Sequence, residues 1–271
     1  MIDATGIAVT LGSRKVLKGL DFQARPGEFT AIVGPNGSGK TTLIRALIGE
    51  LGFAGRLRLN GVDPTRLKPW DLAQMRGVLA QSTQMSFPFT VFEVVRLGAE
   101  AGGHVGPAAT AMTRSALARV DLQGYEGRAY QELSGGEQQR VQLARVLCQV
   151  WEAEGPAGPR WLFLDEPVSA LDIGHQMQVM QLAQDYARAG GGVVAVMHDL
   201  NLTAMFADHV VLLEAGEIAA AGTPAQVMRS DILSRVYDCR LTVIRAAEEP
   251  RVLVVPMPGT APSGTRTTQP A

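Results

Sequence analysis

The sequence predicts an α/β fold, with a parallel β-sheet core, an N-terminal antiparallel β subdomain and an inserted α-helical subdomain. A glycine-rich loop at 34–42 follows an apolar strand at 29–33 and precedes a helical stripe. Residues 161–164 and 193–197 are short, continuous apolar runs with a helix between them, as in strands buried on both faces of a parallel sheet. Residues 88–130 switch to helical periodicity, which predicts the helical insert.

The first part of the chain reads as antiparallel strands. Residues 2–28 alternate between apolar and polar side chains, with apolar runs at 7–11 and 16–22 on either side of a polar turn. A further strand at 56–61 ends in Asn-Gly, a dipeptide typical of tight turns. Another strand is expected at 77–81, just before the helical insert.

The later part of the chain completes the same domain. Residues 209–214 and 217–221 predict a hairpin around Ala-Gly. We therefore expect residues 1–255 to form one domain, with the helical subdomain inserted at about 82–135. The segment 256–271 is rich in Pro, Gly, Thr and Ser, and is predicted to be a disordered tail.

Composition excludes several classes of protein. The 271 residues are 46% hydrophobic and 19% charged, and the formal net charge of −1 argues against a nucleic-acid partner. No apolar run reaches the roughly 18 residues of a membrane span, and the N-terminus lacks a signal-peptide pattern, which predicts a cytosolic location. Cys148 and Cys239 are too few for a zinc site, and Cys148 falls on an apolar helix face.

The glycine-rich loop predicts a polyphosphate site. Two glycines four residues apart, followed by Lys and Thr, allow backbone N–H groups to wrap around phosphates. Lys40 supplies a compact positive charge for the β- and γ-phosphates, and the hydroxyl of Thr41 can ligate Mg²⁺. The predicted nucleotide-binding residues of this loop are Gly34, Pro35, Asn36, Gly37, Ser38, Gly39, Lys40, Thr41 and Thr42.

Polar residues follow two further predicted strands and the strand at 77–81. Because ligands bind outside the carboxyl ends of strands in a parallel sheet, these residues should converge with the loop. Asp165 is placed to hold Mg²⁺ through water, and Glu166 to polarise the water that attacks the γ-phosphate. His198 is expected to hydrogen-bond the γ-phosphate, and Gln81 to contact both Mg²⁺ and the helical insert.

A second motif, Leu-Ser-Gly-Gly-Glu-Gln at 133–138, opens a helix. Ser134 and Glu137 fit a capping box, but that interpretation leaves two consecutive glycines, Gly135 and Gly136, unexplained. The helix N-terminus is a second anion site in a chain whose first loop already holds a nucleotide. The face opposite the apolar stripe carries Gln138, Gln142, Arg145 and Gln149.

Together these motifs resemble those of ATP-binding cassette ATPases. The loop, Gln81, the motif 133–138, Leu-Phe-Leu-Asp-Glu-Pro at 162–167, Ser-Ala-Leu-Asp at 169–172 and His198 follow that family's order and spacing. The resemblance implies a P-loop NTPase core that uses ATP and Mg²⁺, and a homodimer of two chains stacked head to tail. Each ATP would lie between the loop of one chain and the second motif of the other. The partner-facing residues implied are Ser134, Gly135, Gly136 and Gln138, with Asp172 at the same junction.

Within that family the chain is most similar to energy-coupling ATPases of bacterial haem importers. This resemblance rests on the sequences of residues 136–147 and 167–176. It implies a separate integral membrane permease, a substrate-binding protein, and a peripheral position on the cytoplasmic side of the bacterial inner membrane. Residues 87–92, Phe-Pro-Phe-Thr-Val-Phe, are expected to dock the permease, and insert core is the alternative.

Alternatives remain open for the transported substrate. Siderophore or cobalamin import fits the same family, and the sequence discriminates an exporter subunit poorly. A non-transport ATPase acting on DNA or ribosomes would need a coiled coil, zinc-binding cysteines or two cassettes, which the sequence lacks.

Two details concern ligand selectivity. Leu11 stands near the position where the family often has an aromatic residue that stacks on adenine, so base selectivity is expected to be weakened and GTP tolerated. His175 and His209 are not expected to ligate haem, because neither lies in an apolar pocket pattern.

Overall fold

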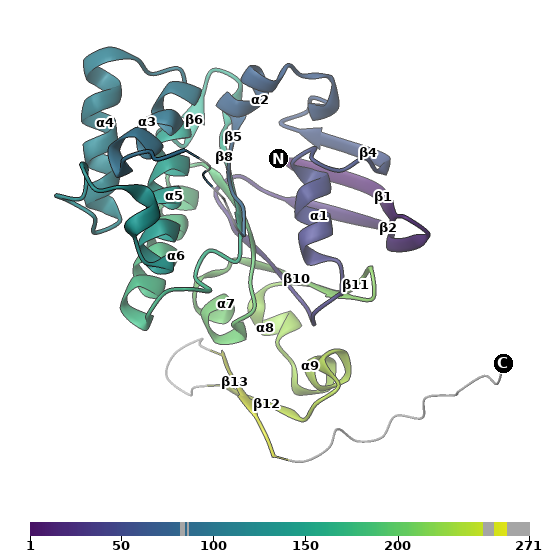
Figure 1. The fold of residues 1–271 in the computed structure, drawn as a ribbon. Coiled ribbons are helices and arrows are strands. Elements are labelled where there is room, and N and C mark those ends of the chain that lie inside the picture. Colours follow the sequence, from purple (N-terminus) through teal and green to yellow (C-terminus); the bar gives the residue numbers. More distant parts are fainter. Residues whose placement is uncertain (82–84, 86, 246–251, 259–271) are drawn as a thin grey trace.

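A six-stranded sheet in the order β11-β10-β3-β9-β8-β5 forms the centre of the computed structural model, which describes residues 1–81, 85, 87–245 and 252–258 (Figure 1). Five strands are parallel and the edge strand β11 is antiparallel to β10. The strands are β3 Phe29–Val33, β5 Arg76–Leu79, β8 Trp161–Asp165, β9 Gly192–Val196, β10 His209–Glu214 and β11 Glu217–Gly222. Every residue of β3, β8 and β9 is buried, which confirms the interpretation of their apolar runs.

The N-terminal subdomain is a three-stranded antiparallel sheet, as predicted. Its strands, in the order β2-β1-β4, are β1 Ile2–Leu11, β2 Arg14–Ala24 and β4 Ala54–Leu59. Helix α1, Lys40–Leu47, lies beside this sheet in Figure 1. Leu43 of α1, Phe22 of β2 and Phe163 of β8 belong to one hydrophobic cluster, so α1 is held between the two sheets.

The predicted helical insert begins after β5. Its helices α3 Val91–Ala101 and α4 Gly106–Arg119 pack against each other and on α5, Gly135–Gln149. Thr90 and Glu93 form a capping box that starts α3. Leu97, which fits a helical periodicity, is 42% exposed because the buried stripe of α3 runs through its neighbours at 94, 95, 98 and 99.

Two further helices pack on the same face of the six-stranded sheet as α5, opposite the face that meets α1. Helix α6, Ile173–Arg188, makes the crossover from β8 to β9, and α7, Leu200–Phe206, follows β9. Beyond the predicted hairpin β10-β11, the chain adds α8 Pro224–Val227, α9 Ser230–Tyr237 and a hairpin of β12 Leu241–Arg245 with β13 Val252–Pro256. The expected disordered tail, 256–271, lies outside the described residues from 259 onward.

Several short elements had no sequence signal strong enough for a prediction. They are η1 Pro64–Arg66, α2 Pro69–Met75, η2 Tyr130–Glu132, and the small hairpin of β6 Glu154–Gly155 with β7 Gly158–Pro159, which lies in the turn-rich stretch before β8. Each has seven residues or fewer, so hydrophobic periodicity has no room to show.

The register of the parallel strands places their carboxyl ends side by side. Val196 pairs with Ile32 on one side and with Asp165 on the other. The loop after β3, the acids at the end of β8 and the histidine after β9 therefore leave the sheet at one edge, as a parallel sheet requires of a ligand site.

Candidate functional site

The loop after β3 leaves free donors at the start of α1. Gly39, with φ of 105°, occupies the N-cap of α1, and no side chain caps the helix. A Cβ on Gly39 would approach Leu17 Cδ2 to 2.8 Å, so only glycine fits both the backbone conformation and the space. The first N–H groups of α1 thus remain available to an anion.

The lysine of this loop is folded back onto the loop itself. Lys40 is buried, and its Nζ donates to the carbonyl oxygens of Gly34 at 2.8 Å and Pro35 at 3.1 Å. Burial lowers the pKa of Lys40, while the negative charges of Glu166 and Asp165 act in the opposite direction. The hydroxyl of Ser38 is also buried and, within the described part of the chain, has no hydrogen-bond partner. A buried cation and a buried unpaired hydroxyl beside free amides suit a polyphosphate.

The three predicted magnesium ligands lie around one cavity of about 240 Å³. Thr41 comes from α1, Asp165 from the end of β8, and Gln81 from just beyond β5. Asp165 is 6% exposed, and its Oδ1 has no hydrogen-bond partner among the residues that the structure describes. This orphaned carboxylate oxygen, next to a hydroxyl and an amide, fits the hard oxygen ligands that Mg²⁺ prefers.

The carboxyl of Asp165 has a strongly perturbed pKa. Burial, reinforced by the negative charge of Glu166, raises the pKa of Asp165 to about 6, while Lys40 and His198 act in the lowering direction. A buried carboxylate whose pKa is raised in this way is typical of a site that binds a cation.

Glu166 and His198 are brought together across two strands. His198 Nε2 lies 2.6 Å from Glu166 Oε1. Glu166 has φ of 54°, a left-handed conformation uncommon for a residue other than glycine. Its N–H donates to Val196 O of the neighbouring strand at 3.1 Å. The carboxylate therefore faces the histidine at the carboxyl edge of the sheet, where both were predicted to lie.

The second motif forms the expected capping box. Ser134 Oγ accepts from the N–H of Glu137 at 3.4 Å, and Glu137 Oε2 accepts from the N–H of Ser134 at 2.8 Å. A Cβ on Gly136 would come within 2.9 Å of Ala170 O, so packing against the segment before α6 explains this glycine. Nothing lies within 4 Å of a Cβ built on Gly135, so the start of α5 is open on that side.

The remaining predicted residues lie around this helix end. Gln138 Nε2 donates to the carbonyl oxygens of Tyr130 and Leu133, both at 3.2 Å. Gln138 and Gly135 line a second cavity of about 270 Å³, and Gln81 lines both this cavity and the first. Asp172 caps α6 by accepting from the N–H of His175 at 3.0 Å.

The polar face of α5 makes hydrogen bonds within the protein and is not simply exposed to solvent. Gln142 is 4% exposed and donates to the hydroxyl of Tyr130 at 3.1 Å. Arg145 donates to Val78 O of β5 at 3.3 Å, and Gln149 donates to the carbonyl oxygens of Ala73 and Arg76. The face therefore binds the backbone that leads into Gln81.

Sequence reasoning missed Gln139, which lies between Gln138 and Gln142 on the same helix. Gln139 Nε2 donates to Glu166 O at 3.0 Å, and Gln139 Oε1 accepts from the N–H of Ala170 at 3.3 Å. A glutamine on a helix gives no signal of its own, because its partners lie on another element.

His175 and His209, which were not expected to bind haem, lie at different places in the fold. His175 Nδ1 lies 2.8 Å from Asp172 Oδ2. His209 begins β10, so it lies at the amino ends of the parallel strands, and the phosphate loop lies at their carboxyl ends. In the described part of the chain no group of three or more His, Cys, Asp or Glu residues is arranged to hold a metal. Cys148 is buried, as predicted, and burial raises the pKa of its thiol to about 12.

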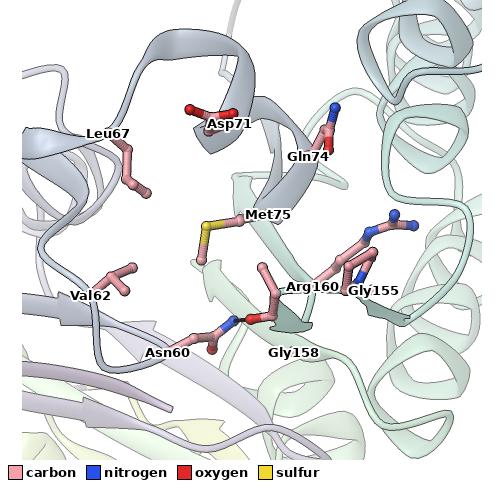
Figure 2. Close-up of a pocket in the computed structure, with 11 residues that line it drawn as sticks. Asn60, Val62, Leu67, Asp71, Gln74, Met75, Gly155, Gly158 and Arg160 are labelled. Atoms are coloured by element: carbon pink, nitrogen blue, oxygen red, sulfur yellow. Dashed lines mark hydrogen bonds between the residues drawn. The ribbon is translucent and has the colours of Figure 1, made fainter.

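A cavity of about 340 Å³ lies away from these residues (Figure 2). Asn60, Leu67 and Met75 line it on one side and Arg160 on the other. Arg160 precedes β8, so this cavity lies toward the amino ends of the parallel strands. The side chains gathered at the carboxyl ends of the strands make that end of the sheet the candidate functional site.

Comparison with known proteins identifies the relatives of this chain. The family model described as "ABC transporter" matches residues 17–169. A protein of Jannaschia sp. named "Hemin import ATP-binding protein HmuV" is 62% identical over 243 residues, which is 90% of this chain and 89% of that protein. A protein of the same name from Rhizobium meliloti is 54% identical over 261 residues, 96% of this chain and all of that protein.

Solved structures show the same fold. A dimeric ATP-binding cassette in a post-hydrolysis state, bound to ADP and Pi, has a TM-score of 0.72 and 25% identity, covering 83% of this chain and 99% of its own. An inward-facing metal-chelate type ABC transporter has a TM-score of 0.76 at 21% identity, covering 94% of this chain and 97% of its own.

Among residues 1–81, 85, 87–245 and 252–258, none of the helices has the length and apolar character of a membrane span. The match to the family model extends from β2 to the segment after β8, and the relatives cover nearly the whole chain. The chain therefore belongs to the ABC transporter family, whose ATP-binding subunits are ATPases.

Proposed function

We propose that this chain is the ATP-hydrolysing, energy-coupling subunit of a hemin importer, with residues 1–255 acting as one ATPase domain. The observation that carries the ATPase activity is the convergence of Lys40, Asp165 and the Glu166–His198 pair at one edge of the sheet. The names of relatives at 62% and 54% identity support hemin as the transported substrate.

The loop would bind the triphosphate of ATP. Its residues 34–42 supply backbone donors, and Lys40 would exchange the carbonyl oxygens of Gly34 and Pro35 for the β- and γ-phosphates. Thr41, Gln81 and Asp165 would hold Mg²⁺, which supplies positive charge that neutralises the phosphate oxygens. The buried, unpaired Oδ1 of Asp165 supports this assignment.

Glu166 and His198 would carry the hydrolytic step. The carboxylate of Glu166 is placed to orient and polarise the attacking water, as a general base or positioning group. His198 would hold that carboxylate through the 2.6 Å contact and hydrogen-bond the γ-phosphate when it is bound. Each of the two side chains leaves the end of a rigid, buried strand, which favours a fixed geometry.

The second motif is proposed to serve the nucleotide of a second copy. Gly135 is open to approach, and Ser134 is exposed at an uncrowded helix N-terminus. In a head-to-tail homodimer, Ser134, Gly135, Gly136 and Gln138 would face the ATP held by the partner's loop, with Asp172 at the junction. The solved dimeric cassette bound to ADP and Pi supports the dimer itself.

The membrane partner is proposed to be a separate permease that works with a substrate-binding protein. The ATPase would then be peripheral, on the cytoplasmic side of the bacterial inner membrane. Phe87 is 69% exposed, and its ring lies edge-on to that of Phe89 at 6.2 Å, close in sequence to Gln81. The exposed ring of Phe87 supports docking of the permease at 87–92, while Phe89 is partly buried and packs against the core.

The test is copurification with the permease encoded beside the gene, followed by ATPase assays in lipid. The assay would include the binding protein loaded with hemin, a ferric siderophore or cobalamin. Hemin should stimulate hydrolysis most, and the Glu166→Gln complex should bind ATP without turnover. Stimulation by siderophore or cobalamin alone would replace hemin with that substrate, and ATP-dependent efflux would make the complex an exporter.

A further inference from the structure

The backbone carbonyl of Glu166 is held by several donors. Gln139 Nε2 donates to Glu166 O at 3.0 Å, and Ser169 donates to the same oxygen from its Oγ at 3.3 Å and its N–H at 3.4 Å. On the other side of the residue, the N–H of Glu166 donates to Val196 O. Both ends of the Glu166 backbone are therefore fixed, although its φ of 54° is an unfavourable conformation for a residue other than glycine.

The carboxamide of Gln139 links three segments of one chain. It belongs to the second turn of α5, the helix that Ser134 caps. Its Nε2 reaches the residue after β8, and its Oε1 accepts from the N–H of Ala170, just before α6. Because one partner is an acceptor and the other a donor, the orientation of the amide is determined by its surroundings.

The start of α5 packs closely against the segment before α6, which Gln139 also contacts. A Cβ on Gly136 would come within 2.9 Å of Ala170 O and 3.4 Å of Leu171 Cδ2, so the start of α5 touches the backbone before α6 directly. Gln139, one turn later, is half-buried over the same segment. The start of α5 cannot move against Glu166 without breaking one or both hydrogen bonds of this side chain.

We infer that Gln139 is a positioning residue for hydrolysis: its carboxamide fixes the backbone of Glu166 and of Ala170 relative to the start of α5. The left-handed backbone of Glu166 directs its carboxylate to His198, and displacement by about 1 Å is enough to lower turnover strongly. The carboxamide acts on the chemical step and leaves the phosphate loop, on another element, unchanged. The inference rests on the proposed role of Glu166.

The test separates turnover from nucleotide binding in two variants of Gln139. Gln139→Met keeps the length of the side chain and removes both hydrogen bonds. Gln139→Glu keeps the shape and the acceptor for Ala170 N–H, but places a carboxylate oxygen against Glu166 O. Both variants should lower kcat at least tenfold, with Glu at least as severe as Met. The KM for ATP and the Kd for a fluorescent ATP analogue should change less than twofold.

Two matched variants serve as controls. Ser169→Ala removes one donor to Glu166 O and leaves the link to α5 intact, so its kcat should fall less than that of Gln139→Met. Gln178→Ala removes another glutamine amide that donates to a backbone carbonyl, Arg119 O at 3.0 Å at the end of α4. This variant leaves the hydrogen bonds of Glu166 in place and should keep the kcat of the unmodified chain.

Specific outcomes would overturn the inference. If Gln139→Glu turned over like the unmodified chain, shape alone would matter and the positioning role would be wrong. The same conclusion follows if either Gln139 variant lost ATP affinity in proportion to kcat, or if its melting temperature fell so far that unfolding explained the loss. A Glu166→Gln variant measured in parallel isolates the proposed function, because normal turnover there would refute the role of Glu166 itself.

Discussion

His198 Nε2 lies 2.6 Å from Glu166 Oε1, across the boundary between β9 and β8. The two side chains are 32 residues apart in sequence and meet because Asp165 pairs with Val196 in the parallel register. A one-residue slip of this register would turn the residues at the strand ends to opposite faces. The pair thus depends on the sheet as a whole.

Replacing the histidine should impair turnover more than binding. His198→Ala removes the group that holds the Glu166 carboxylate, and we expect kcat to fall about 100-fold or more. ATP binding should persist, because the loop and Lys40 are unchanged. Steady-state hydrolysis and equilibrium binding of ATP would measure the two effects. A variant with normal kcat would remove His198 from the hydrolytic step.

The buried acid at the end of β8 should make the nucleotide-free protein less stable as the pH rises. The pKa of Asp165 is about 6 in the folded chain against the ordinary aspartate value of 3.8, so the folded state binds more protons between these values. Its contribution to stability is therefore full below about pH 4 and is lost as the pH rises through 6. Asp165→Asn should raise the free energy of unfolding by about 1–2 kcal/mol at pH 7.5, with little gain at pH 4.

A second aspartate offers a control of opposite sign. The N–H and ring of His175 hold the pKa of Asp172 below its usual value, so this carboxylate stabilises the fold at neutral pH and loses that effect in acid. Asp172→Asn should lower the melting temperature at pH 7.5. Thermal melts of both variants at pH 3, 4 and 7.5, without nucleotide, give the comparison, because the effect of Asp172 is lost only below about pH 3.8. A stabilising effect of Asp165→Asn that did not grow with pH would contradict the assignment to charge burial.

The second motif should matter to the dimer and not to the isolated chain. Ser134→Arg fills the open start of α5 with a long charged side chain, where the partner's nucleotide is proposed to lie. ATP affinity of the monomer should stay within twofold, while ATP-driven dimerisation and cooperative hydrolysis should be lost. Ser134→Thr, which keeps a capping hydroxyl, should retain both. Light scattering with ATP in a Glu166→Gln background reads dimerisation, and an intact dimer in Ser134→Arg would refute the shared site.

Base selectivity should be weak and easy to increase. Leu11, at the end of β1, is 45% exposed and offers adenine only apolar contact. GTP should compete with ATP within about tenfold, because base stacking on an aromatic ring contributes about 1–3 kcal/mol that this chain lacks. Leu11→Tyr should raise the preference for ATP severalfold, and Leu11→Met should not. Strict ATP preference in the unmodified chain, measured by competition, would contradict the expectation.

Much of the site follows from local sequence. The phosphate loop is recognised because glycines with positive φ and the following Lys and Thr are needed within a few residues. Asp165, Glu166 and His198 are recognised by their position after apolar runs, since strands of a parallel sheet end at one edge. The fold class follows from the same runs, and the turn at Asn60-Gly61 adopts the positive φ that its sequence favours, whereas Ala215 adopts a positive φ that alanine does not favour.

The tertiary structure alone decided how these parts are held. Gln139 reaches Glu166 across 27 residues of sequence, and Gln149 reaches Arg76 across 73. Hydrophobic periodicity predicts which residues of α5 share its polar face. It does not predict which other elements that face contacts. Hydrogen-bond partners far along the chain depend on where two elements pack. The hairpin of β12 with β13 likewise exists because Val252 and Val254 reach the core and the backbone of Val254 pairs with the amide of Asn201.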